Sequence, residues 1–195
     1  MIAFNKLLLS LIWLISFTFS GGCVNSPALD LTERKSVYAK NFMVSAANPY
    51  ATKAGLDILR AGGSAVDAAI AVQMVLTLVE PQASGIGGGG FLLHFKPSTD
   101  HTSSILSAYD GRETAPVGTT ETLFLRDDGE PLSWDERKIG GKSVGVPGII
   151  RMLALAHQDH GRLTWKKLFE PAIRLAQAGF SVSPRLNKMI RRDKF

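Results

Sequence analysis

The segment from Ala65 to Leu76 carries only two polar side chains, Asp67 and Gln73, and has the pattern of a helix that is apolar on nearly every side. Ser64 is a suitable N-cap at its start, and Pro81 prevents the helix from continuing. A helix that is apolar all round must be covered by other elements. The sequence therefore predicts a domain in which this helix is central and buried.

Further helices and two strands are expected around this segment. A helix that begins at Pro49, with Asn48 as its N-cap, ends at Gly62–Gly63, where positive φ is easily adopted. The remaining patterns predict helices at 149–160, at 164–178 and from Ser183–Pro184 onward, and strands at 91–95 and 104–109 with a turn at 97–100. Helices that cover a small sheet indicate part of a layered α/β domain.

The first 22 residues have the features of an export signal. Lys6 provides the positive charge, and Leu7 to Phe19 form an apolar stretch that is too short to span a bilayer. Small residues follow at 20–22. We therefore expect residues 1–22 to be a signal peptide, and we exclude them from the fold.

Cys23 is the only cysteine, which excludes an internal disulfide. It follows a glycine directly, as the lipidated cysteine of a bacterial lipoprotein does, so lipidation of Cys23 is expected. Ordinary cleavage that leaves a free thiol is the alternative. The expected organisation is a signal peptide at 1–22, a polar tether at 23–42 and a folded domain at 43–195, in a protein that is periplasmic or lipid-anchored to a bacterial membrane.

The formal net charge of +5, with 20% charged residues, is mildly basic. The excess of Lys and Arg is not interleaved with aromatic residues as it is on nucleic-acid-binding surfaces. The basic residues between Arg185 and Lys194 are better explained as a solvated helix face. We expect no nucleic-acid partner.

The run from Gly85 to Gly90 formally satisfies the dinucleotide-binding pattern G-x-G-x-x-G. That site needs a strand before the glycines and a helix after them, whereas here the order is reversed. Close backbone packing between a buried helix and a strand is the preferred interpretation. Gly141-Lys142-Ser143 resembles the end of a P-loop, but the first glycine of that motif is replaced by Glu136.

His157 and His160 lie one turn apart near a helix end, where positive charge is favoured by the helix dipole. Metal binding would need a third ligand, and none is evident nearby. No metal site and no organic cofactor are expected.

Arg112 follows the predicted second strand in the segment Tyr109 to Pro116, between acidic residues. A guanidinium offers a planar fork of donors that meets a carboxylate in two parallel hydrogen bonds. From the residues alone, an internal ion pair with Glu113 or Asp110 is the better explanation of Arg112. A substrate carboxylate is the other possible partner.

Several short motifs occur together in one order along the chain. They are Met43-Val44-Ser45-Ala46, Gly62-Gly63-Ser64-Ala65-Val66-Asp67-Ala68-Ala69, the glycine run with Tyr109 to Pro116, Gly145-Val146-Pro147-Gly148 and Glu170-Pro171-Ala172-Ile173-Arg174-Leu175-Ala176. Together they resemble the large-subunit signature of the gamma-glutamyltransferases, also called glutathione hydrolases. The resemblance covers Met43 to Phe195, about the first third of a family member.

The resemblance implies an N-terminal-nucleophile hydrolase fold, an αββα sandwich, of which this chain would hold only the first third. It implies transfer or hydrolysis of the γ-glutamyl group of glutathione or a related amide through a γ-glutamyl-threonine ester. It assigns to Arg112 the binding of the donor's α-carboxylate, and it implies a small subunit of the same proenzyme as partner.

In the family, the nucleophilic threonine opens that small subunit, beyond residue 195. No catalytic residue is therefore assigned in this chain, and the chain alone is expected to be inactive. Thr119 and Thr120 are not substitutes, because they stand inside the chain, where we expect their hydroxyls to cap the short segment Leu123–Leu125. Two alternatives stay open: a cephalosporin or glutaryl acylase of the same fold, and an inert, truncated lipoprotein.

Overall fold

The computed structural model describes residues 36–98 and 103–193. The expected signal peptide, the lipidation site Cys23 and most of the expected tether lie outside these residues. Contacts between residues divide the chain into two compact units, the first of which ends at Lys40. The unit described below begins at Asn41, two residues before the expected start of the domain. Within the described residues, no helix has both the length and the apolar character needed to cross a bilayer.

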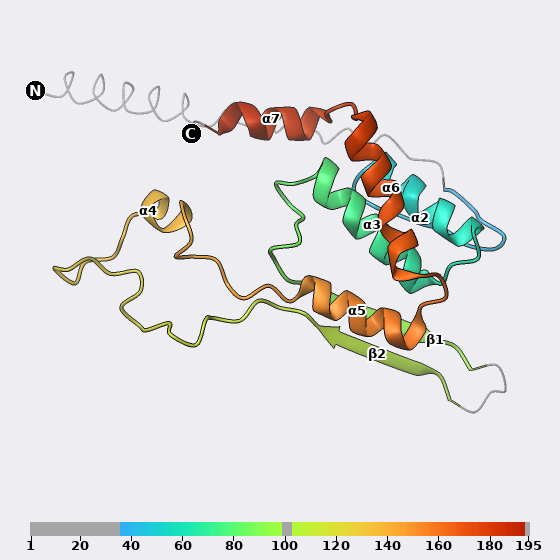
Figure 1. Ribbon diagram of the computed structural model, residues 1–195, viewed down its shortest axis with the longest axis horizontal. Helices are drawn as coiled ribbons and strands as arrows, with labels where there is room; N and C mark the ends of the chain where they lie inside the picture. The colour runs from blue at the N-terminus through green and yellow to red at the C-terminus, as the bar shows by residue number, and fades with distance from the viewer. Residues whose placement is uncertain (1–35, 99–102, 194–195) are drawn as a thin grey trace, which may run out of the picture. The chain divides into compact units, whose positions relative to one another are not determined.

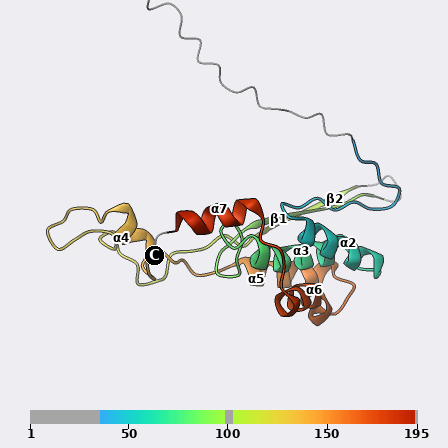
Figure 2. The same ribbon diagram turned by 90° about the horizontal axis from the view of Figure 1, so that it is seen from above.

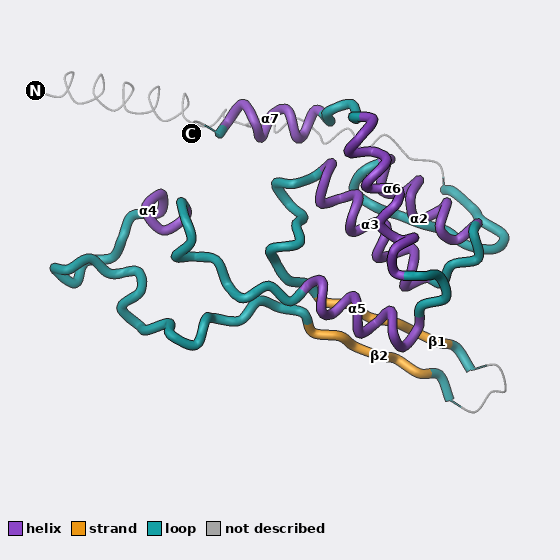
Figure 3. The backbone as a smooth tube through the Cα atoms, viewed as in Figure 1, coloured by secondary structure: helices purple, strands orange, loops and turns teal. Residues whose placement is uncertain are grey.

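The described residues form six helices and two strands (Figures 1 and 3). In chain order they are α2 (Pro49–Arg60), α3 (Ala65–Val79), β1 (Phe91–Lys96), β2 (Ile105–Asp110), α4 (Trp134–Lys138), α5 (Ile149–His160), α6 (Trp165–Ala178) and α7 (Pro184–Arg192). The predicted helices and strands are confirmed within one or two residues at each end, apart from α3, which continues to Val79. The short helix α4 was not predicted. In the segment Leu123–Leu125, the first two residues lie in a turn and Leu125 forms an isolated bridge with Pro131.

The helix α3 is the central element, as its composition requires. It packs against α2, α5 and α6, and Val66, Ile70 and Val75 are almost completely buried. A capping box starts the helix: Ser64 Oγ accepts the backbone N–H of Asp67, and the Asp67 carboxylate accepts the backbone N–H of Ser64. The core therefore forms around one apolar helix with other helices on several sides.

The end of α3 is joined to the start of α2 by a buried carboxylate. Glu80 accepts hydrogen bonds from Asn48 Nδ2 at 3.0 Å and from Gln82 Nε2 at 2.6 Å. Asn48 also caps α2, because its Oδ1 accepts the backbone N–H of Tyr50. The pKa of the Glu80 carboxyl is lowered, most of all by the hydrogen bond from Asn48 and then by the bond from Gln82 and the charge of Arg185. Its burial acts in the opposite direction.

The strands β1 and β2 form an antiparallel hairpin in which Phe91 pairs with Asp110. Helix α5 runs along this hairpin (Figure 1), and Leu92 and Tyr109 pack against the main core from the covered face. The alternate residues of β1, Phe91 and Leu93, are about 70% exposed on the other face. Of the predicted sandwich, the described residues therefore contain one hairpin with helices on one side.

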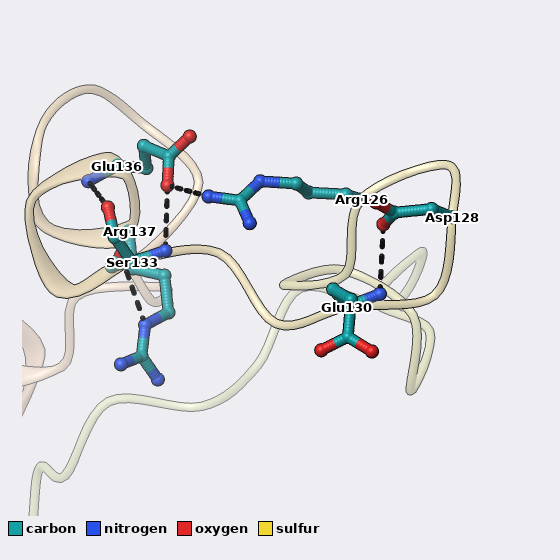
Figure 4. A network of polar contacts seen from close by, with 6 residues as sticks. All are labelled: Arg126, Asp128, Glu130, Ser133, Glu136 and Arg137. Carbon is teal, nitrogen blue, oxygen red and sulfur yellow. Dashed lines mark hydrogen bonds and ion pairs between the residues drawn. The ribbon is translucent and has the colours of Figure 1, made fainter.

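Residues 115–145 form a long excursion, which we call the arm. An isolated bridge between Thr114 and Val146 closes its base, and Figure 2 shows its helix α4 at the opposite end from α2, α3, α5 and α6. The arm is held by its own polar contacts (Figure 4): Glu136 accepts from Ser133 N–H at 2.7 Å and pairs with Arg126 at 2.6 Å. The Ser133 bonds, then the Arg126 guanidinium, lower the pKa of the Glu136 carboxyl to about 2.

Candidate functional site

Arg112 lies just beyond the end of β2, where the chain leaves the sheet. Asp110, the last residue of the strand, accepts the backbone N–H of Arg112 through Oδ1 at 2.8 Å. A carboxylate that bonds the backbone two residues ahead makes an Asx turn. This turn points the chain away from the hairpin and leaves the Arg112 side chain 66% exposed.

The glycine run lies directly against this turn. Gly90 and Gly111 exchange two backbone hydrogen bonds, at 3.2 and 2.9 Å, and Gly88 O accepts the backbone N–H of Gly148 at the start of α5. A Cβ on Gly89 would lie 2.5 Å from Gly111 O and 2.6 Å from Glu113 Oε2. The predicted close backbone packing is therefore confirmed, and only glycine fits at this position.

Arg112 pairs with Glu113, as the interpretation from the residues alone anticipated. The Nη1–Oε2 distance is 2.6 Å, and Glu113 is the less exposed partner at 28%. The backbone N–H of Glu113, then the charge of Arg112 and the N–H of Gly89, lower the pKa of the Glu113 carboxyl, while desolvation opposes them. Glu113 thus remains charged next to Arg112 and fixes one side of the guanidinium.

Arg112 and Glu113 line an open cleft of about 320 Å³. The other lining residues come from the base of the arm: Thr114, Ala115, Pro116, Thr119, Leu123, Phe124, Lys142, Ser143, Val144 and Gly145. Val146 N–H donates to Thr114 O at 2.8 Å, which brings the two ends of the arm together. The cleft thus combines cationic groups, hydroxyls and an apolar wall.

Lys142 was not predicted to lie near Arg112. In the sequence, Gly141-Lys142-Ser143 has only the pattern of an incomplete P-loop, and no local pattern places Lys142 near residue 112. The two cations share a cleft because Thr114 pairs with Val146, and such a pairing cannot be read from spacing.

His157 and His160 take part in two separate groups. His157 Nε2 lies 2.9 Å from Leu163 O and 3.5 Å from the buried Asp67 Oδ1. His160 Nε2 lies 2.9 Å from Tyr109 Oη, and its ring stacks on that of His94 at 3.8 Å. In the part of the chain that the structure describes, no three His, Cys, Asp or Glu side chains form a group that could hold a metal ion.

Comparisons with known proteins show which family the chain is similar to. A family model described as gamma-glutamyltranspeptidase matches residues 51–195. The chain is 40% identical over 165 residues to the glutathione hydrolase proenzyme of Bacillus subtilis. The matched stretch covers 84% of this chain and 27% of that protein. The chain thus spans about a quarter of the length of the curated relatives it matches.

Two solved structures are informative. The gamma-glutamyltranspeptidase of Pseudomonas nitroreducens, complexed with L-DON, has a TM-score of 0.71 and 35% identity, over 80% of this chain and 44% of that one. The cephalosporin acylase of Bacillus halodurans has a TM-score of 0.57 and 31% identity, over 80% of this chain and 29% of the acylase chain. This likeness confirms the predicted fold class, that of the N-terminal-nucleophile hydrolases.

Proposed function

The chain belongs to the gamma-glutamyltranspeptidase family, and we propose that Arg112 binds the α-carboxylate of a γ-glutamyl donor such as glutathione. The enzyme that contains this segment would move the γ-glutamyl group from the donor amide to water or to an amine acceptor. Arg112 would hold the donor so that the γ-carbonyl meets the nucleophile. Positioning of this kind contributes to the rate by fixing the reacting groups in a productive geometry.

The observation that carries this proposal is the free side of an exposed but anchored guanidinium. Nη1 of Arg112 bonds to Glu113, and the Asx turn with Asp110 fixes its backbone. A guanidinium has five N–H donors, so Nε and Nη2 can still meet a carboxylate in two parallel bonds. The ion pair with Glu113 and the proposed carboxylate binding therefore use different edges of the same group.

We assign no described residue as nucleophile or general base. The hydroxyl of Thr120 lies 3.0 Å from that of Thr122, which cannot act as a base. An activated hydroxyl nucleophile needs an adjacent base, which in N-terminal-nucleophile enzymes is the freed amine. We therefore propose that the nucleophile is the N-terminal threonine of a small subunit, with which this segment would pair.

The second candidate is an acylase of the same fold, which the likeness to the cephalosporin acylase supports. A glutaryl group keeps the terminal carboxylate of a γ-glutamyl group and lacks only its α-amine, so Arg112 could bind either donor. The match of residues 51–195 to the gamma-glutamyltranspeptidase family favours the γ-glutamyl donor. An inert lipoprotein that binds such ligands without turning them over is the third candidate.

A hybrid enzyme tests the assignment. Residues 43–195 replace the matching part of the Bacillus subtilis proenzyme, and Arg112→Ala and Arg112→Lys are compared with the parent hybrid. In the hybrid we expect the small subunit to cover the donor bound at Arg112. Truncating one partner of a desolvated, hydrogen-bonded charge pair costs about 2–5 kcal/mol, so donor kcat/KM should fall by at least tenfold. Arg112→Lys should recover part of this loss, because an ammonium keeps the charge without the fork.

Self-cleavage into two subunits should survive both changes, which is checked on a gel. If the Arg112→Ala variant is processed normally and keeps a near-parental donor kcat/KM, then Arg112 is only a structural partner of Glu113. A hybrid that hydrolyses glutaryl amides in preference to γ-glutamyl amides would favour the acylase.

A further inference from the structure

The cleft beside Arg112 contains a second cation whose charge is not balanced within it. Among the lining residues, Arg112 and Lys142 are basic and Glu113 is the only acid. Glu113 is already paired with Arg112. Within residues 36–98 and 103–193, Lys142 forms no ion pair with an acid. The cleft therefore carries an excess positive charge at Lys142.

The rest of the lining suits a small ligand with polar ends and an aliphatic middle. Thr114, Thr119 and Ser143 offer hydroxyls, and Leu123 and Phe124, both half-buried, form an apolar wall. A volume of about 320 Å³ lies at the lower end of the range for small-molecule sites, roughly 300–1,000 Å³. The cleft is thus of the size and chemistry for a dipeptide-like anion.

The placement of Lys142 depends on close backbone packing at the base of the arm. Val146 bonds to Thr114, and a Cβ on Gly145 would lie 2.9 Å from Glu113 Cβ. The segment that carries Lys142 therefore lies directly against the segment that carries Arg112. The two cations are held in one cleft by backbone contacts, not by a contact between themselves.

We propose that this cleft selects a ligand with two carboxylates, one bound by Arg112 and the other by Lys142. The inference rests on the proposed function: the first carboxylate is that of the γ-glutamyl α-carbon, and the second belongs to the leaving part of the donor. The rigid fork of Arg112 sets the orientation of the first. Lys142 is a point charge on a flexible stem, so it selects for charge and tolerates differences in the leaving part.

Two matched ligands test the inference on the full chain: γ-glutamylglycine and γ-glutamylglycinamide, which differ in one carboxylate. Their affinities are measured at low ionic strength by NMR titration for the parent, Lys142→Gln and Arg112→Gln. The matched control is Lys166→Gln, which removes the same charge from an exposed position of α6. Circular dichroism spectra of the variants check that each retains the parental helix content.

The parent should prefer γ-glutamylglycine by about threefold, as for a solvent-exposed ion pair. Lys142→Gln should abolish the preference, whereas Lys166→Gln should keep it. Added salt should reduce the preference in the parent, because exposed charges are screened. Arg112→Gln should weaken the binding of both ligands.

The outcomes separate the two assignments. A preference that survives in Lys142→Gln, or a parent that binds both ligands equally, overturns the role of Lys142 alone. Affinities that are unchanged in Arg112→Gln overturn the proposed function of Arg112. Failure of the parent to bind either ligand counts against both.

Discussion

Asp67, in the first turn of α3, accepts a hydrogen bond through Oδ2 from the backbone N–H of Leu163, 96 residues later, at 3.1 Å. The same oxygen accepts the N–H groups of Arg162 and Ser64, both at 2.9 Å. The residue is fully buried. One carboxylate thus fastens the start of the central helix to the connection between α5 and α6.

Asp67→Ala should destabilise the domain by about 3 kcal/mol, because three N–H groups lose their acceptor and each unsatisfied group costs roughly 1–3 kcal/mol, partly relieved by relaxation. The free energy of urea unfolding measures this loss, and hydrogen exchange should show faster exchange at Arg162 and Leu163. Asp57→Ala is the matched control, since Asp57 lies in exposed ion pairs with Lys53 and Arg60 and should cost below about 1 kcal/mol. Equal losses for the two variants would contradict the role given to Asp67.

Gly89→Ala should disturb the site, because the new Cβ would meet Gly111 O at 2.5 Å and Glu113 N at 2.7 Å, both backbone atoms. Overpacking of this kind costs about 1–3 kcal/mol, and the Arg112–Glu113 pair should be displaced. Gly87→Ala is the control, since a Cβ there meets nothing within 4 Å. The melting temperature and the Arg112 Nε–Hε resonance report the two effects, and a Gly89→Ala protein with a parental spectrum would refute the packing argument.

The pH dependence of stability should include a contribution from Glu80. Its bond from Asn48, then that from Gln82, lower the pKa of the folded state below the ordinary value of 4.5. The carboxylate therefore stabilises the fold fully above pH 4.5, and this stabilisation is lost as the pH falls through the lower, folded-state pKa.

Urea unfolding between pH 7 and pH 3 checks this prediction. Glu80→Gln should be less stable than the parent at pH 7, and the difference should shrink toward pH 3. Glu170→Gln is the control, because Glu170 forms an exposed pair with Arg174. A difference between parent and Glu80→Gln that does not change with pH would contradict the assignment.

Lipidation of Cys23 remains a prediction from the sequence. If the cysteine is modified, Cys23→Ser should move the protein from the membrane fraction to the soluble fraction and abolish labelling with palmitate. An unlabelled parent with the same fractionation as the variant would favour an ordinary cleaved signal.

Local signals in the sequence predicted most of the helical framework. Asn48, Ser64 and Ser183 were identified as N-caps, and each accepts the expected backbone N–H. The helix α4 was not predicted, although the sequence contains a signal for it. Ser133 and Glu136 have the spacing of a capping box.

The candidate site was only partly predictable. Arg112 was found by its residue type and by a family resemblance, and its pairing with Glu113 follows from adjacency. Lys142 could not be found in this way, because its position depends on a backbone bridge between residues far apart in the sequence. Asp67 was recognised only as one of two polar positions in an apolar helix. Its bonds to Arg162 and Leu163 depend on how α5 and α6 pack.

The bridge between Thr114 and Val146 also has an evolutionary consequence. It fixes the base of the arm, which shapes the cleft, and places no constraint on the tip, which includes the turn at Gly129, where φ is +85°. Insertions or deletions at the tip change loop length at only a small entropic cost, which grows slowly with the number of residues. The tip can therefore diverge among descendants of this sequence while the ligand-facing positions at the base stay in register.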